Sequence, residues 1–185
     1  MRREASGDEE IRAAWVEEPP VLNSAVRLVE YDPAWPGLFE REARRVRSLL
    51  GGEVLRLEHV GSTSVPGLAA KPIVDMVLVV ADPADESRYV APLEAAGYRL
   101  VIREPEWHEH RVLKGPDTDV NLHVHPPSSP EVARMVAFRD RLRSDEADRV
   151  LYERVKRELA ARTWTYIQHY ADAKSAVVDD IMSRA

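Results

Sequence analysis

The residues best suited to chemistry lie between Glu58 and Val80, in the stretch EHVGSTSVPGLAAKPIVDMVLVV. Within it, Asp75 opens the most apolar run of the chain, which extends from Met76 to Val80. A carboxylate at the head of a buried strand costs stability unless it is paired or binds a cation. Asp75 is therefore the first candidate for a functional group.

A turn rich in hydroxyl groups precedes this aspartate. Gly61 lets the backbone approach a ligand closely, and Ser62, Thr63 and the amides of the turn can bind phosphate oxygens. Lys71 can neutralise phosphate charge, and Asp75 can hold a divalent metal, Mg²⁺ or Mn²⁺. Together these groups predict a site for phosphoryl-type transfer. Each group also has an ordinary structural explanation: a tight turn, a lysine exposed to solvent, and a carboxylate paired with a nearby basic residue.

A third polar group stands in the sequence Asn121-Leu122-His123-Val124-His125. The alternation of side chains along a strand places Asn121, His123 and His125 on one face. The two histidines could bind one metal with Asp75, and Glu58 is the nearest further acid. The pattern favours a simpler arrangement, in which one histidine is hydrogen-bonded in a cleft and the other is solvated. His123 is the candidate for a ligand or general base.

Further basic and histidine residues are less informative. Arg139 and Lys174, in the helical C-terminal part, would close the pocket over a phosphate, although charges at helical spacing are usually a solvated face. His108 and His110 are expected at the surface.

A serine–histidine hydrolase is an alternative that the sequence offers. Ser62 or Ser64 with His59 or His123, and with Asp75, could form a triad. No nucleophile-elbow sequence is present, so this alternative has little support.

The elements that must position these residues follow from hydrophobic spacing and turn signals. Asp32 and Pro33 open a helix whose apolar side includes Trp35 and Leu50, and Ser129 with Pro130 starts the first of about three C-terminal helices. Another helix is expected after 82–83. Strands are expected at 26–29, 54–60, 73–80, 98–102, 110–114 and 120–125.

The order of elements predicts an α+β fold with a helical C-terminal part at about 129–185. Residues 25–185 form the domain. Residues 1–24 are an extension outside the core, partly mobile, with a short helix from Asp8 to Val16.

The amino-acid composition excludes several classes of function. The chain has 185 residues, of which 44% are hydrophobic and 31% charged, and it contains no cysteine. Disulfides, thiolate metal sites and thiol nucleophiles are thereby excluded. The net charge of −6 argues against a protein that coats nucleic acid. No apolar run approaches the roughly 20 residues that span a bilayer, and no signal peptide is evident, so we expect a cytoplasmic protein without membrane partners.

Five stretches resemble the GrpB family: VRLVEYDPAWPGLFE, LEHVGSTSVPGLAAKPIVDMVLVV, NLHVHP, FRDRLRSD and YADAKSAVVDDI. The resemblance covers the chain from about Val26 to its C-terminus. It implies a nucleotidyltransferase-like fold, a mixed sheet flanked by helices in which the glycine-serine turn leads to the carboxylate strand. Members of the family occur alone and also joined to dephospho-CoA kinase domains.

One position departs from active nucleotidyltransferases of this fold, which usually carry two alternating carboxylates on the strand and a third on a neighbouring strand. Asp75 matches the first, but Val77 stands at the second, and the neighbouring strand offers Asn121, His123 and His125. A two-metal site needs more anionic oxygen than one aspartate supplies.

The sequence therefore leaves three hypotheses. The first is a protein that binds a nucleotide or phosphorylated small molecule, with metal-dependent nucleotidyl transfer as its catalytic version. The second is a non-catalytic nucleotide- or partner-binding module, for example linked to coenzyme A metabolism. The third and weakest is a histidine-metal hydrolase.

Overall fold

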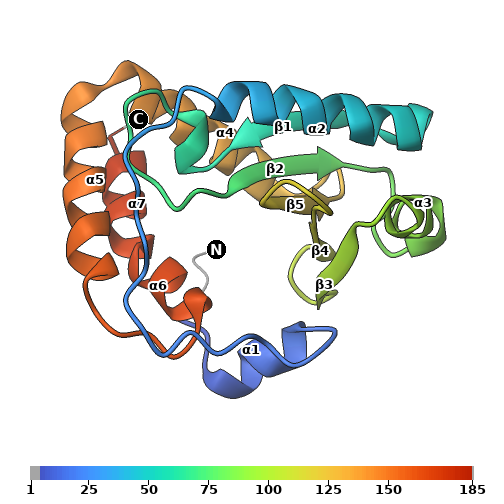
Figure 1. Ribbon diagram of the computed structural model, residues 1–185, viewed down its shortest axis with the longest axis horizontal. Coiled ribbons are helices and arrows are strands. Elements are labelled where there is room, and N and C mark those ends of the chain that lie inside the picture. The colour runs from blue at the N-terminus through green and yellow to red at the C-terminus, as the bar shows by residue number, and fades with distance from the viewer. Residues whose placement is uncertain (1–4, 185) are drawn as a thin grey trace.

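The computed structural model describes residues 5–184, so residues 1–4 of the expected extension and Ala185 lie outside it. The helices are α1 (Asp8–Ala14), α2 (Trp35–Leu50), α3 (Val90–Ala95), α4 (Pro130–Ser144), α5 (Glu146–Ala160), α6 (Ile167–Ala173) and α7 (Ser175–Met182). The strands are β1 (Arg56–Val60), β2 (Val74–Val79), β3 (Arg99–Glu104), β4 (His110–Lys114) and β5 (Val120–His125). The fold is α+β, as expected (Figure 1).

The five strands form one mixed sheet in the order β1-β2-β5-β4-β3. β2 pairs in parallel with β5, and the other neighbours pair antiparallel. β2 is apolar in most positions because helices cover both faces of the sheet, whereas β5 alternates apolar and polar residues. The register sets Asp75 opposite Val60 on one side and opposite Asn121 on the other.

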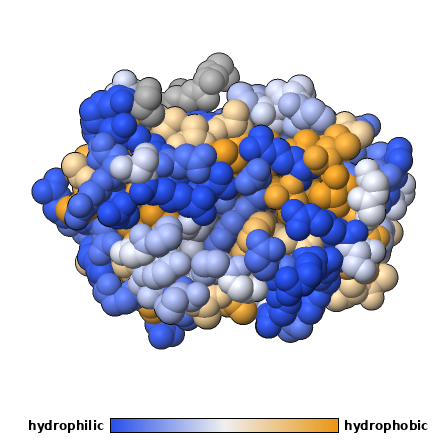
Figure 2. All heavy atoms as spheres, turned by 90° about the horizontal axis from the view of Figure 1, so that it is seen from above, coloured by the Kyte–Doolittle hydropathy of each residue, from blue (hydrophilic) through white to orange (hydrophobic). Residues whose placement is uncertain are grey.

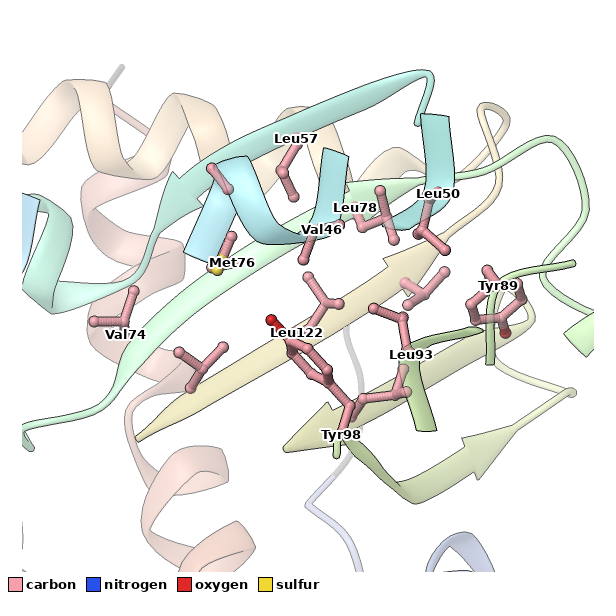
Figure 3. Packing of buried hydrophobic residues seen from close by; sticks show 14 of the residues in the cluster. Val46, Leu50, Leu57, Val74, Met76, Leu78, Tyr89, Leu93, Tyr98 and Leu122 are labelled. Atoms are coloured by element: carbon pink, nitrogen blue, oxygen red, sulfur yellow. The ribbon is translucent and has the colours of Figure 1, made fainter. Parts of the chain in front are cut away.

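One face of the sheet packs against α2 and forms the main core (Figure 3). Val46 and Leu50 of α2 meet Met76, Leu78 and Leu122 of the central strands, and all five are buried. The helical spacing of apolar residues in α2 and the alternation in the strands produce this contact.

The opposite face carries the polar row and is partly covered by α4. Val77 and Val79 of β2 pack there with Val60 and with Val132 of α4. α5 and α7 pack against α4 and stand at one side of the sheet (Figure 1). Alternate side chains of β2 thus pack on opposite faces of the sheet, and both faces are covered. This explains the continuous apolar run of β2.

Three expected elements differ in the structure. The prediction of a strand at 26–29 is wrong, because Val29 makes only an isolated bridge with Ala70. After Pro83 a 3₁₀ turn, η3 (Glu86–Arg88), precedes α3, since the Asp82 side chain accepts from Ala84 N (2.9 Å) and forms a local turn. The last expected helix is divided at Lys174 into α6 and α7.

The described part of the N-terminal extension packs against the domain. Ile11 of α1 is buried, and Val16 N donates to Val101 O of β3 (3.0 Å). Further along, Leu22 N donates to Thr165 O (2.8 Å), just before α6. This segment therefore runs from the edge strand β3 to the C-terminal helices.

Hydrophilic residues dominate the face seen in Figure 2, with smaller hydrophobic areas between them. Within residues 5–184, no helix combines the length and apolar character that crossing a membrane requires.

Candidate functional site

The glycine-serine turn lies against Asp75. Gly61 has φ 69° and ψ −174°, and a Cβ at this position would lie 2.6 Å from Asp75 Oδ2. Glycine is therefore needed both for the backbone conformation and for the close approach. The chain continues as the 3₁₀ turn η2 (Ser62–Ser64), and Arg143 of α4 donates two hydrogen bonds to Ser64 O (2.9 and 2.7 Å).

A row of polar groups crosses the sheet from Asp75. Asn121 Nδ2 donates to Asp75 Oδ1 (2.7 Å), and Lys114 Nζ donates to Asn121 Oδ1 (2.5 Å). The strand register produces this order, because Asp75, Asn121 and Lys114 are direct partners on β2, β5 and β4. The amide orientation follows from this network, with its oxygen toward the lysine.

His123 lies one step along the same face. Its Nε2 is 3.7 Å from Asp75 Oδ1, and its Nδ1 shares a 3.0 Å hydrogen bond with His110 Nε2. His110 Nδ1 in turn hydrogen-bonds Glu104 Oε2 (2.7 Å). The expectation that His110 is a surface residue is wrong: it is 5% exposed, because its side chain lies beside His123 and His125 on the covered face. His108 is exposed as expected.

Asp75 is ionised in this setting. Burial opposes the charge, but the nearby His123, Lys71 and Asn121 favour the carboxylate and lower its pKa to about 2. The residue is thus a fixed negative charge at the floor of the site at neutral pH.

All four lysines of the chain gather around this carboxylate, although the sequence holds 22 arginines. Lys71, Lys114 and Lys174 line a cleft of about 500 Å³, and Lys156 joins Lys71 and Lys174 around an adjoining cavity of about 40 Å³. Asp75 and Ser62 border both spaces. Four lysine side chains thus lie around the one carboxylate of Asp75.

The lysines are not in ordinary solvent. Burial lowers the pKa of Lys71 to about 8 and that of Lys156 to about 7, with Lys174 adding repulsion in both cases. Burial also lowers the pKa of Lys114 and of Lys174. Within residues 5–184, the side-chain ammonium groups of Lys71 and Lys174 make no hydrogen bond and no close ion pair, although the Lys174 ammonium lies 4.6 Å from the Tyr170 ring centroid. Their N–H groups remain available to a ligand.

Tyr170 borders the smaller cavity and is 1% exposed. Its hydroxyl has no hydrogen-bond partner among the described residues. A buried hydroxyl without a partner costs free energy. A polar ligand or water in the cavity would remove that cost.

The larger cleft has mostly apolar walls. Met135 and Phe138 of α4, Ile167 of α6 and Val112 of β4 line it, and Trp15 of the N-terminal segment completes one wall. A ligand with an apolar or aromatic body and an anionic end matches this combination.

Several predicted site residues are engaged elsewhere. Arg139 lines the cleft but donates to Glu58 Oε2 and His59 O (both 2.9 Å) and to Asp140. Glu58 also pairs with Arg56. His125 shares a 3.2 Å hydrogen bond with Ser129, and burial lowers its pKa to about 3.

These contacts bear on the predicted metal ligands. The structure does not bring Glu58 or His125 to Asp75, and Val77 points to the covered face at the position of a second carboxylate. Among residues 5–184, no three Asp, Glu or His side chains group as metal ligands. Mg²⁺ and Mn²⁺ prefer oxygen ligands, so the residues around Asp75 do not fit such an ion held by the protein alone. The divalent metal stays a prediction.

The serine–histidine triad is not assembled either. His59 faces the main core, stacks on Phe39 and shares a 3.1 Å hydrogen bond with Thr63 Oγ1. Ser64 Oγ donates to Gly61 O (2.5 Å). Ser62 instead has the Lys156 ammonium 3.0 Å from its Oγ.

Sequence reasoning did not assign Lys114, Lys156, His110 or Tyr170 to the site. The scarcity of lysine beside 22 arginines was a usable signal for the first two. His110 and Tyr170 depend on long-range packing, for which the local pattern carries no signal.

The comparisons with protein families, with individual proteins and with solved structures agree on one family. The family model described as GrpB protein matches residues 25–184. UPF0157 protein BH1888 of Halalkalibacterium halodurans is 58% identical, over 96% of this chain and 91% of that protein. UPF0157 protein SCO7215 of Streptomyces coelicolor is 48% identical, over 86% of this chain and 84% of that protein.

Two further matches extend the comparison. A crystal structure of conserved protein GrpB from Enterococcus faecalis is 31% identical with a TM-score of 0.73, covering 85% of this chain and 98% of that one. A dephospho-CoA kinase of Mycolicibacterium paratuberculosis is 29% identical, over 89% of this chain but only 47% of that protein. From the match over residues 25–184 and the similarity to these relatives, the chain belongs to the GrpB family.

Proposed function

We propose that the cleft binds a nucleotide or another phosphorylated small molecule. The observation that carries this proposal is the pair of ammonium groups of Lys71 and Lys174, which face one cleft without a hydrogen-bond partner in the described residues. A phosphate between them would supply the missing acceptors and offset their mutual repulsion. The amides of Ser62 and Thr63 also make no hydrogen bond within residues 5–184 and would add donors.

The remaining groups would orient the rest of the ligand. Asp75 can accept a hydrogen bond from a ligand hydroxyl, since it is ionised and held by Asn121. The apolar walls at Met135 and Phe138 would take a base or another organic group. In the catalytic version, His123 would accept a proton from an attacking hydroxyl.

Binding without transfer is the second candidate, and Val77 favours it. Its buried side chain occupies the place of the second carboxylate between Glu58 and His123 in the sheet register. A link to coenzyme A metabolism is suggested only by the relatives named dephospho-CoA kinase.

The binding test is thermal unfolding with nucleoside mono-, di- and triphosphates and with dephospho-coenzyme A, each with and without Mg²⁺. A true ligand at 100 times its dissociation constant should add about 2.7 kcal/mol to the free energy of unfolding. Lys71→Met and Lys174→Met should each reduce this gain, and Arg162→Met, which removes an exposed charge, should not. Equal gains in Lys71→Met, or no gain in the wild type, would contradict the proposal.

The transfer test is pyrophosphate release from nucleoside triphosphates with Mg²⁺ or Mn²⁺. Turnover that is lost in Asp75→Asn supports the catalytic version. A ligand that stabilises the protein without turnover supports the binding module.

A further inference from the structure

Ser62 and Lys156 form a pair that phosphate binding alone does not explain. Lys156 Nζ lies 3.0 Å from Ser62 Oγ and also donates to the carbonyl of Ala69. Lys156 is 1% exposed, whereas Ser62 is partly exposed and borders the larger cleft as well as the small cavity. The serine therefore stands between an enclosed amine and the open cleft.

We propose that Ser62 is a nucleophile activated by Lys156, which takes up a phosphoryl or nucleotidyl group from a phosphate ester or anhydride bound in the cleft. A neutral amine fits the observed contacts, because one N–H can donate to Ala69 O while the lone pair accepts the Ser62 hydroxyl proton. A serine with a lysine as its base is one of the known arrangements for nucleophilic catalysis.

The surroundings of Lys156 favour the neutral amine on balance. Burial and the cations of Lys174 and Arg157 disfavour the ammonium, while the carboxylate of Glu153 favours it. The face of Tyr152, 5.0 Å from Nζ, also favours the charged form. The net effect places the Lys156 pKa at about 7, so both forms are populated at neutral pH.

The step balances without a further reactant. Ser62 Oγ forms a bond to phosphorus, the bond from phosphorus to the leaving oxygen breaks, and its electron pair stays on that oxygen. The serine proton passes to Lys156 Nζ, which can return it to the leaving oxygen. The free amides of Ser62 and Thr63, with Lys71 and Lys174, would hold the phosphoryl oxygens.

The identity of the transferred group rests on the proposed function, but the activation of Ser62 does not. A fluorophosphonate probe tests the latter without a natural ligand, since the serine oxygen displaces fluoride from phosphorus. We expect one label per chain, located at Ser62 by peptide mass spectrometry. Ser62→Ala should abolish it, and Ser128→Ala, which removes an exposed serine, should leave it unchanged.

The variants Lys156→Met and Lys156→Arg test whether Lys156 acts as a general base or only as a structural positive charge. Both should slow labelling by about 100-fold, the lower range for a lost general base, although arginine keeps the charge. In the wild type, the labelling rate should rise with pH through about 7 and then level off. Circular dichroism and thermal unfolding identify any variant that fails to fold.

Three results would overturn the activated serine: labelling that survives in Ser62→Ala, a wild-type rate that follows hydroxide concentration without levelling, or a folded Lys156→Arg that labels at the wild-type rate. These outcomes are independent of nucleotide binding. A protein that labels at Ser62 but is not stabilised by any phosphorylated compound would contradict only the proposed ligand class.

Discussion

At the scale of single residues, the choice of lysine over arginine has a physical meaning. Arginine keeps its charge when buried, whereas the pKa of a buried lysine can fall into the physiological range. Among residues 5–184, many arginines form ion pairs with carboxylates, whereas all four lysines lie around Asp75. The cluster therefore combines charge for a ligand with one amine that can lose its proton.

The buried amine of Lys156 should make the ligand-free protein more stable at alkaline pH. The pKa of Lys156 is about 7 in the folded chain, below the ordinary lysine value of 10.5, so the unfolded chain binds more protons between these values. Stability then rises with pH, by about 2 kcal/mol from pH 7 to 9 for this group. Urea unfolding at the two pH values measures the gain.

Lys156→Met is the control, since methionine carries no proton. We expect the wild type to gain about 2 kcal/mol more than the variant between pH 7 and 9. Parallel pH profiles for the two proteins would show that Lys156 is protonated in the folded state at pH 7.

The sequence identified Asp75, the turn and Lys71 because their types and spacing are local features. It did not identify Lys156, which is 94 positions from Ser62, or the contact between His110 and His123. Those pairings exist only after helices and strands have packed. The hydrogen bond from Arg139 to Glu58 could not be predicted for the same reason.

At the scale of elements, the turn between β1 and β2 depends on glycine at position 61. Gly61→Ala would force an L side chain into φ 69° and bring its Cβ within 2.6 Å of Asp75 Oδ2. We expect a loss of about 2 kcal/mol in the free energy of unfolding, from backbone strain and displacement of the carboxylate. Chemical denaturation measures it.

Gly52→Ala provides the matched control, because a Cβ there meets nothing within 4 Å. This variant should change the stability by only a few tenths of a kcal/mol. A Gly61→Ala protein as stable as Gly52→Ala would show that the turn can move away from Asp75.

The strands and the long helices were predictable because their hydrophobic periods are clear, and β4 and β5 begin and end where expected. The strand expected at 26–29 failed because a strand needs a continuous partner, and Val29 finds one only at Ala70. The number of C-terminal helices was missed because Lys174 ends one helix and begins the next without a glycine or proline.

At the scale of the whole molecule, the cleft is built from distant parts of the chain. The sheet supplies its floor, α4 and α6 supply one side, and the N-terminal segment supplies Trp15. Trp15 pairs with Ile102 of β3 through an isolated bridge. The segment before residue 25, which lies outside the matched family region, thus contributes a wall of the cleft proposed to bind the ligand.

This placement makes Trp15 a reporter of ligand binding. A ligand that fills the cleft should change the fluorescence of Trp15, and Trp15→Phe should remove that change. Trp35, the first residue of α2, is 3% exposed in the main core, so Trp35→Phe should retain it. A ligand-induced change that persists in Trp15→Phe would place the ligand elsewhere.

The position of β5 also has a consequence for how the molecule folds. β5 enters the sheet between β2 and β4, and its parallel pairing with β2 joins Asp75 to Asn121 across 46 positions. The hairpin of β3 and β4 closes over a much shorter distance, so we expect it to form earlier. The proposed ligand site is then completed only when β5 inserts. A nascent chain that has emerged only as far as β4 has the turn and Asp75 but lacks Asn121 and His123, so ligand capture would mark the late stage of its folding.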